Sequence, residues 1–397
     1  MSNLNFTSKR IVSIDIFRAL TMFFMIFVND LWSLTNVPEW LKHKSADVDG
    51  IGFSDIIFPA FLFIVGLSIP FAIKARRKKG DNNLFVLKHI IIRTVALIIM
   101  GLFMVNFESI NDELLSINKY IWEIIMALAI FLVWLYYKPF EQYHKKITIV
   151  LQFIGIALFI YLAVIYKGGT SENIEWMKPH WWGILGLIGW AYLLNSTFYL
   201  FFGHRLIFLF TMFIVLHLLN VQEFTTFAEL PTFKIVISAS NHVSVTAGMV
   251  AGSLLLHYKR LEKENAFLFA LFILGFLSLI YGFALRPHWG GFSKIRATPS
   301  WTSVCIGISY LSFLGLYIIT DKLKFVWWAK PIKTAGTNTL TCYVIPYFIY
   351  PLMVIIGFNF PKIISDGNIG LIKSLLFSLG IIGIATLLNK FNIKLKI

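Results

Sequence analysis

The chain has 397 residues, of which 58% are hydrophobic and only 14% are charged. Soluble globular domains are about 45–50% apolar, so the composition excludes an ordinary soluble protein and indicates a polytopic helical membrane protein. The formal net charge of +15 would favour a nucleic-acid partner in a soluble protein. Here the cations lie in short loops between apolar runs, so we expect no nucleic acid.

Twelve apolar runs are long enough, or nearly so, to cross a hydrocarbon core of about 30 Å, which takes roughly 20 helical residues. They cover residues 14–33, 55–73, 89–106, 120–137, 147–166, 180–201, 206–221, 241–258, 265–285, 300–320, 334–357 and 369–389. The seventh run is short, so we predict eleven or twelve transmembrane helices. The expected fold is all-α, a single transmembrane domain over residues 1–397.

The basic residues are distributed unevenly between alternate loops. Lys and Arg number 22 in the loops on the side of the N-terminus and 10 in the loops on the other side. By the positive-inside rule, both termini are predicted to be cytoplasmic in a multi-pass protein of the cell (inner) membrane. The densest basic run follows the second span and comprises Lys74, Arg76, Arg77, Lys78 and Lys79. The large apolar surface must be covered by lipid or by a second copy of the chain, so a homodimer is one alternative.

Ionisable residues are concentrated on the first two predicted spans. Asp15, Arg18 and Asp30 lie on the first, and Asp55 opens the second. Such groups cost a few kcal/mol each within a membrane, so they normally face a bundle interior or a watery cavity and indicate function. The alternative for Asp15 and Arg18 is an ion pair one turn apart that fixes the inner end of the helix.

The first span also carries a polar stripe. Arg18, Met22, Met25 and Asn29 are separated by four, three and four residues, which places them on one helical face about 16 Å long. This face leads from a cation near the cytoplasmic end to an amide near the outer end.

The loop that follows contains a single histidine, His43, between Lys42 and Lys44. The two lysines oppose a further positive charge on the ring and favour the neutral imidazole that a general base needs. The alternative is a solvated loop histidine without a chemical role.

Two further polar stretches lie near the ends of later spans. Trp301 ends the stretch 294–301 on the outer side, and Asn338 lies in the stretch 336–341 on the inner side. Small and hydroxyl residues are also common where helices pack, so a structural role is the alternative for both. Cys305 and Cys342 lack a CxxC spacing and there is no HExxH motif, so we expect no metal.

Several of these stretches together resemble a known family. They are SIDIFRALTMFFMIFVND at 13–30, the loop histidine at 43, FSDIIFPAFLFIVGLSIPF at 53–71, KIRATPSW at 294–301 and AGTNTLTCY at 335–343. In this order they resemble the transmembrane acyltransferases related to heparan-α-glucosaminide N-acetyltransferase, and within them the bacterial DUF5009 branch. The sequence departs from the family at Ala19, where glycine is usual, and lacks the Trp-Asn-Gly that follows the histidine of the animal enzyme.

The resemblance implies transfer of an acetyl group from cytoplasmic acetyl-CoA to an amino sugar or sugar hydroxyl on the outer side. It places His43 in the catalytic position, as base or acyl carrier, and Asn29 beside the thioester. Cations near the inner ends of the first two spans suit the phosphates of CoA, and we assign this role to Arg18, Lys74, Arg76 and Arg77. The remaining polar candidates, with a substrate-binding or a structural role, are Asp15, Asp30, Asp55, Trp301 and Asn338.

The expected partners are therefore acetyl-CoA, a sugar acceptor and membrane lipid. A sugar or amino-sugar transporter is the alternative function, because twelve spans with both termini inside is also a common carrier layout. Such carriers are built from two similar halves, and no repeat between halves is visible in this sequence.

Overall fold

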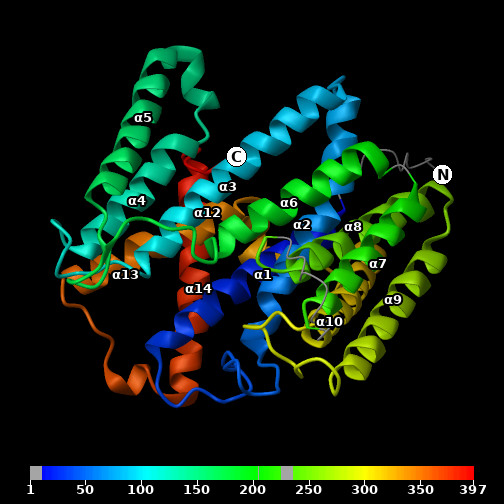
Figure 1. Ribbon diagram of the computed structural model, residues 1–397. Coiled ribbons are helices and arrows are strands. Elements are labelled where there is room, and N and C mark those ends of the chain that lie inside the picture. Colours follow the sequence, from blue (N-terminus) through cyan, green and yellow to red (C-terminus); the bar gives the residue numbers. More distant parts are fainter. Residues whose placement is uncertain (1–10, 204, 225–235) are drawn as a thin grey trace.

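The computed structural model describes residues 11–203, 205–224 and 236–397, and nearly all of its regular structure is helical (Figure 1). The α-helices are α1 (Val12–Asp30), α2 (Phe53–Lys78), α3 (Asn83–Phe107), α4 (Lys119–Trp134), α5 (Lys138–Ile165), α6 (Gly183–Phe202), α7 (Leu206–Gln222), α8 (Ala239–Arg260), α9 (Glu264–Leu285), α10 (Pro299–Tyr317), α11 (Lys333–Thr337), α12 (Thr339–Val344), α13 (Pro346–Ile355) and α14 (Gly367–Lys390). Short helices η1 (Leu31–Ser33), η2 (Ile318–Lys322), η3 (Trp327–Ile332) and η4 (Lys362–Ile364) join some of them. Two two-residue strands, β1 (Gly168–Gly169) and β2 (Ile174–Glu175), pair antiparallel.

Each of the twelve predicted runs is helical, so the all-α membrane fold is confirmed. By length and composition, eight of the described helices could cross a membrane, or nine if one bent pair counts as a single span. This is fewer than the predicted eleven or twelve. Helices α4 and α7 have only 16 and 17 residues, shorter than the roughly 20 needed, and α8 carries several Ser, Thr and His residues.

The eleventh predicted span is broken rather than continuous. The segment Trp327–Thr337 meets Thr339–Ile355 at an angle of 80°, with Asn338 at the break. Gly336 lies against α1 so closely that a Cβ there would come within 2.3 Å of the backbone oxygen of Asp15. The absence of a side chain at Gly336 therefore lets the break pack directly onto the first helix.

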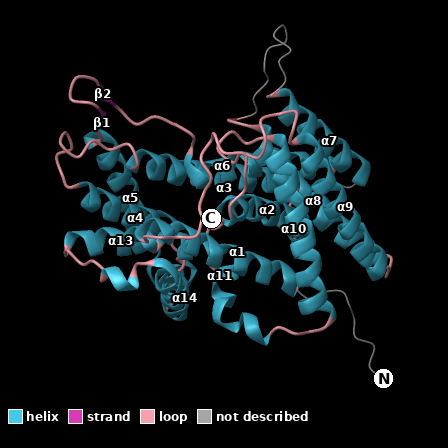
Figure 2. Cartoon of the chain, turned by 90° about the horizontal axis from the view of Figure 1, so that it is seen from below, coloured by secondary structure: helices cyan, strands magenta, loops and turns pink. Residues whose placement is uncertain are grey.

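The helices form two lateral groups with α1, α2, α3 and α6 between them. In both views α4, α5 and α13 lie together on one side and α7 to α10 on the other (Figures 1 and 2). Helix α2 packs against α8 at two glycines: a Cβ on Gly66 or on Gly248 would lie 1.8 Å from the carbonyl oxygen of Val245 or Phe63. Small residues at the contact thus bring the two backbones together, as in other membrane helix pairs.

Helices α1 and α2 run in opposite directions and define two ends of the molecule. The loop of residues 34–52 lies at one end, and the basic C-terminal turn of α2 lies at the other. Ile11 and the C-terminal residues Leu395 to Ile397 line the same cavity as Lys74 and Lys78. The two ends of the described chain therefore lie on the side of the basic run, while their cytoplasmic location stays a prediction and residues 1–10 lie outside the described residues.

Asp30 joins α1 to the C-terminal helices. Its carboxylate pairs with Lys373 at 2.8 Å, with both side chains almost fully buried, and it also accepts hydrogen bonds from Tyr350 and Ser374. Lys373 makes a second bond to Ser33. A buried ion pair whose remaining hydrogen-bonding capacity is used in this way can be retained in an apolar bundle.

We expect Asp30→Ala to destabilise the protein by about 3–5 kcal/mol, because the ammonium of Lys373 would be left buried and uncompensated. Thermal unfolding of the purified protein in detergent measures the effect. The double variant Asp30→Leu with Lys373→Met should recover most of the loss, since it removes both charges. Asp112→Ala, which breaks the more exposed pair with Lys119, should cost less than about 1 kcal/mol; equal losses for Asp30→Ala and Asp112→Ala would contradict this account.

Candidate functional site

His43 is held by a buried carboxylate at the start of α2. Its Nδ1 lies 2.7 Å from Oδ1 of Asp55, and the side chain of Asp55 is 1% exposed whereas that of His43 is 47% exposed. The other carboxylate oxygen accepts the backbone N–H groups of Gly52 and Lys44 at 3.0 and 3.2 Å. With the carboxylate as acceptor, this pair favours the tautomer that has the proton on Nδ1 and a lone pair on Nε2.

The cation beside His43 comes from another part of the chain. Lys42 and Lys44 pair with Glu39, at 2.7 and 3.4 Å. Lys294, from the loop between α9 and α10, places its Nζ 3.1 Å from Nδ1 and 3.5 Å from Nε2 of His43. Burial lowers the pKa of Lys294 from its ordinary value, although the charge of Asp55 opposes the shift. An acid, a histidine and an amine therefore meet at this end of the molecule.

Two ion pairs dock the histidine loop onto the loop that carries Lys294. Asp49 accepts the backbone N–H of Phe292 at 2.7 Å and Nε of Arg286 at 2.9 Å. Asp47 pairs with Arg296 at 3.0 Å. The position of Lys294 beside His43 thus depends on contacts between segments about 250 residues apart in sequence.

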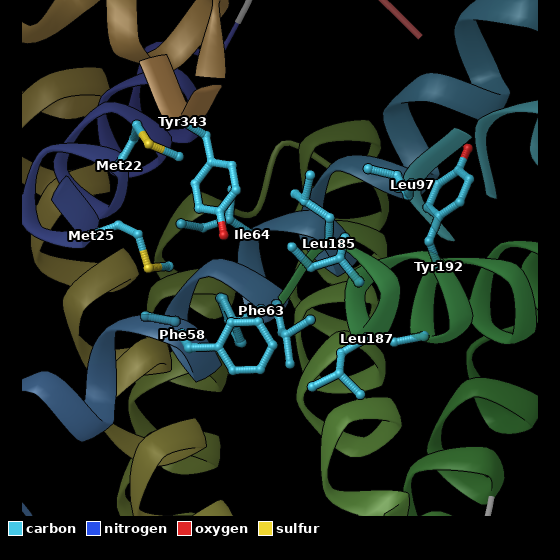
Figure 3. Close-up of a cluster of buried hydrophobic side chains, with 14 of the residues drawn as sticks. Met22, Met25, Phe58, Phe63, Ile64, Leu97, Leu185, Leu187, Tyr192 and Tyr343 are labelled. Atoms are coloured by element: carbon cyan, nitrogen blue, oxygen red, sulfur yellow. The ribbon is translucent and has the colours of Figure 1, made fainter. Parts of the chain in front are cut away.

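The other end of the molecule contains a large cavity, with a volume of about 1220 Å³. Its described lining includes seven basic residues and two acidic ones: Arg18, Lys74, Lys78, Arg93, Lys259, Arg260 and Lys396, and Asp15 and Glu262. The lining also contains apolar side chains, with Met22, Met25 and Tyr343 on one side and Leu185 on the other (Figure 3). The cavity therefore combines a strongly basic entrance with a largely apolar interior.

The polar stripe predicted on α1 is part of this lining. Arg18, Met22 and Met25 all border the cavity. Asn29 is one turn further along; it is exposed and is not among the lining residues. Arg18 is fixed by bonds from its guanidinium to Ser68 and the carbonyl of Gly336, at 2.7 and 3.0 Å, and by Asp15 at 3.4 Å.

The basic run at the C-terminal end of α2 divides between two faces. Lys74 and Lys78 border the large cavity. Arg76 pairs with Asp81 at 2.9 Å, and Arg77 donates to the carbonyl of Leu200 and borders a smaller adjoining pocket of about 380 Å³. The i, i+4 spacing of Lys74 and Lys78 was a signal for a shared face that sequence reasoning did not use. Lys259, Arg260 and Lys396 gave no such signal, because only the tertiary fold brings them here.

The remaining predicted polar residues have separate environments. Trp301 is 4% exposed and packs with Phe292 and Cys305 near the start of α2. Asn338 is 5% exposed and borders the cavity at the break between α11 and α12. Both cysteines are buried with free thiols, and the described residues contain no group of three His, Cys, Asp or Glu side chains that could hold a metal.

Known proteins resemble the part of the chain that carries His43, Asp55 and the basic run. Residues 10–179 match the family model described as heparan-alpha-glucosaminide N-acetyltransferase, catalytic. This segment of the chain is similar to the catalytic part of that family. The proteins of that name from Mus musculus and Homo sapiens are 32% and 31% identical over 104 and 97 residues.

These matches confirm the resemblance read from the first two motifs, while the DUF5009 branch stays a prediction. They cover 25% and 24% of this chain and 14% of the length of each relative. Lys294 and Asn338 lie outside the segment matched by the family model. The roles of these two residues, and the activity of the whole chain, therefore have to be inferred from the geometry of the site.

Docking of the histidine loop is expected to depend on pH through Asp49. The N–H of Phe292 and then the guanidinium of Arg286 hold the pKa of Asp49 below its ordinary value of 3.8. A carboxyl with a lowered pKa stabilises the docked loop above that ordinary value, and the contribution is lost as the pH falls through the lowered pKa.

At neutral pH, Asp49→Asn mimics the protonated state and should increase hydrogen exchange of the amides in residues 44–52. Asp47→Asn, which removes a carboxylate that is 90% exposed, should have a smaller effect because solvent screens its pair with Arg296. Equal exchange in the two variants would contradict the assignment of docking to Asp49.

Proposed function

We propose that the chain is a transmembrane acetyltransferase that moves an acetyl group from cytoplasmic acetyl-CoA to an amino sugar or sugar hydroxyl on the outer side. The observation that carries the proposal is the pairing of His43 with Asp55 at one end of α1 and α2, with the basic cavity at the other end. The relationship to a sugar N-acetyltransferase supports the reaction class. Location in the inner membrane and the cytoplasmic side of the cavity belong to the same proposal.

The cavity suits the donor in charge and in shape. The phosphates of CoA would lie among Lys74, Lys78, Lys259 and Arg260 at its entrance, where charge-assisted hydrogen bonds are strong. The pantetheine arm would extend along the face of α1 past Arg18 toward the apolar interior. A volume of about 1220 Å³ exceeds the roughly 300–1,000 Å³ of common small-molecule sites, as a long donor requires.

The chemistry at the outer end follows from the tautomer of His43. The acceptor amine attacks the acetyl carbonyl carbon, a C–N bond forms, the C–S bond breaks, and the sulfur leaves as the thiolate of CoA. Nε2 of His43 takes the proton that the amine loses, and Asp55 stabilises the resulting imidazolium. Asn29, near the outer end of α1, is proposed to donate to the carbonyl oxygen as its charge develops.

His43 can act as a general base or as an acyl carrier, and both roles use Nε2. Labelled acetyl-CoA supplied without acceptor separates them. Label recovered on His43 after rapid quenching indicates a carrier, and its absence while the acceptor is still acetylated indicates direct transfer.

His43→Ala is expected to reduce acetyl transfer to glucosamine by at least about a hundredfold, because general base catalysis contributes roughly 10²–10⁴. The assay gives purified protein acetyl-CoA and glucosamine and measures N-acetylglucosamine. His288→Ala is the matched control, since His288 is an exposed histidine in another outer loop. Full activity of His43→Ala would show that His43 is not catalytic.

The two faces of the basic run give a second test. Lys78→Gln should raise the KM for acetyl-CoA about fivefold, because one cation of the cavity entrance is lost. Arg76→Gln should leave it unchanged, because Arg76 is turned to Asp81. A larger effect at Arg76 than at Lys78 would place the donor outside this cavity.

The transporter alternative gains no support from the relatives, which are named as transferases. Uptake of labelled hexosamine into vesicles without an acyl donor would favour it over the proposed reaction.

A further inference from the structure

Asn338 combines features that are rarely found together in an apolar bundle. Its side chain is only 5% exposed, and it borders the large cavity. Its Nδ2 makes no hydrogen bond to any of the described residues. A buried donor without a partner costs about as much free energy as a lost hydrogen bond, so such a group in a cavity indicates a ligand that completes it.

The backbone around Asn338 fixes where this donor lies. Asn338 is the residue at which the broken helix turns, and its own N–H still bonds to the carbonyl of Thr334 at 2.8 Å. Two residues earlier, Gly336 contacts Asp15 and Ala19 of α1 and accepts a bond from Arg18. The break between α11 and α12 therefore packs directly against α1 beside Arg18.

That position lies between the two chemically distinct parts of the cavity. On the entrance side are the cations at the C-terminal ends of α2 and α8, including Lys78 and Lys259. On the other side are Met22, Met25 and Tyr343, in the apolar interior (Figure 3). A ligand that extends from the cations to the apolar interior would have its middle section near Asn338.

We propose that Asn338 donates a hydrogen bond to an amide carbonyl in the pantetheine arm of the acyl donor. This inference rests on the proposed function and adds a specific contact to it. The arm joins the phosphates to the thioester and contains two amides, each of which loses water on entering an apolar interior. A ligand carbonyl without a donor and a protein amide without an acceptor satisfy each other at this depth.

The assignment predicts which part of the donor depends on Asn338. Asn338→Ala should weaken binding of CoA about tenfold, because the carbonyl would be buried without its donor. Adenosine 3′,5′-bisphosphate carries the same nucleotide without the pantetheine arm, so its affinity should not change. Asn338→Asp has nearly the same shape without the N–H groups and should weaken binding of CoA at least as much.

Asn106 provides a matched control. It is also a fully buried amide, but its Nδ2 donates to the carbonyls of Leu102 and Lys178, at 2.8 and 2.7 Å. Asn106→Ala should therefore lower the melting temperature and leave CoA binding unchanged. Asn338→Ala should weaken CoA binding and leave the melting temperature unchanged, because the Nδ2 of Asn338 has no partner among the described residues.

The experiment measures equilibrium binding of both ligands to the full chain in detergent, with thermal unfolding of each variant. Unchanged CoA affinity in Asn338→Ala and Asn338→Asp would overturn the inference and leave the proposed function intact. Equal weakening of both ligands would also overturn it, since the contact would then be to the nucleotide or the cavity would have collapsed. Failure of the unaltered chain to bind CoA would overturn the proposed function itself.

Discussion

The arrangement of this protein depends on the cost of placing charge within an apolar helical bundle. Three solutions are used on α1 and α2. Asp30 is neutralised by Lys373 and surrounded by hydroxyl donors. Arg18 borders the large cavity and bonds to Ser68 and Gly336. Asp55 sits in the first turn of a helix, where backbone N–H groups are available to a carboxylate. The first solution holds the C-terminal helices to α1, and the other two mark the ends of the candidate site.

Asp55 has two tasks that follow from one position. Its Oδ2 accepts the N–H of Gly52 and so fixes the start of α2, while its Oδ1 orients the imidazole of His43. The helix start and the histidine are therefore set by the same carboxylate, which limits how far the loop of residues 34–52 can move without loss of helix capping. Lys294 is positioned beside the histidine differently: its loop packs on the histidine loop through the ion pairs of Asp47 and Asp49 with two arginines.

Local sequence patterns predicted the features that depend on local structure. Apolar runs located the helices, helical spacing placed Arg18, Met22 and Met25 on one lining face, and the loop position singled out His43. The break at Asn338 was missed because the small and hydroxyl residues 336–341 were included in one continuous span of residues 334–357. Close packing of Gly336 on α1 accompanies the break. Lys294 begins the stretch 294–301, but its approach to His43 requires contacts between distant segments.

Helical spacing alone places Lys78, and not Arg76, on the same face of α2 as Lys74. No pattern in the sequence predicts that Lys396 also lines the cavity.

The separation of the cavity from His43 bears on what must cross the membrane. Met25 is the last residue of α1 in the cavity lining, and neither His43 nor Asp55 belongs to that lining. Phe58, one turn inside Asp55, is buried in the core. Under the proposed function, the phosphates would remain with the basic entrance, where their charge is compensated. The acetyl group stays bonded to the sulfur of the donor until the acceptor attacks, and this thioester is uncharged, so it is the part of the donor that an apolar layer opposes least. Chemistry at the outer end then requires only the uncharged thioester to pass beyond Met25.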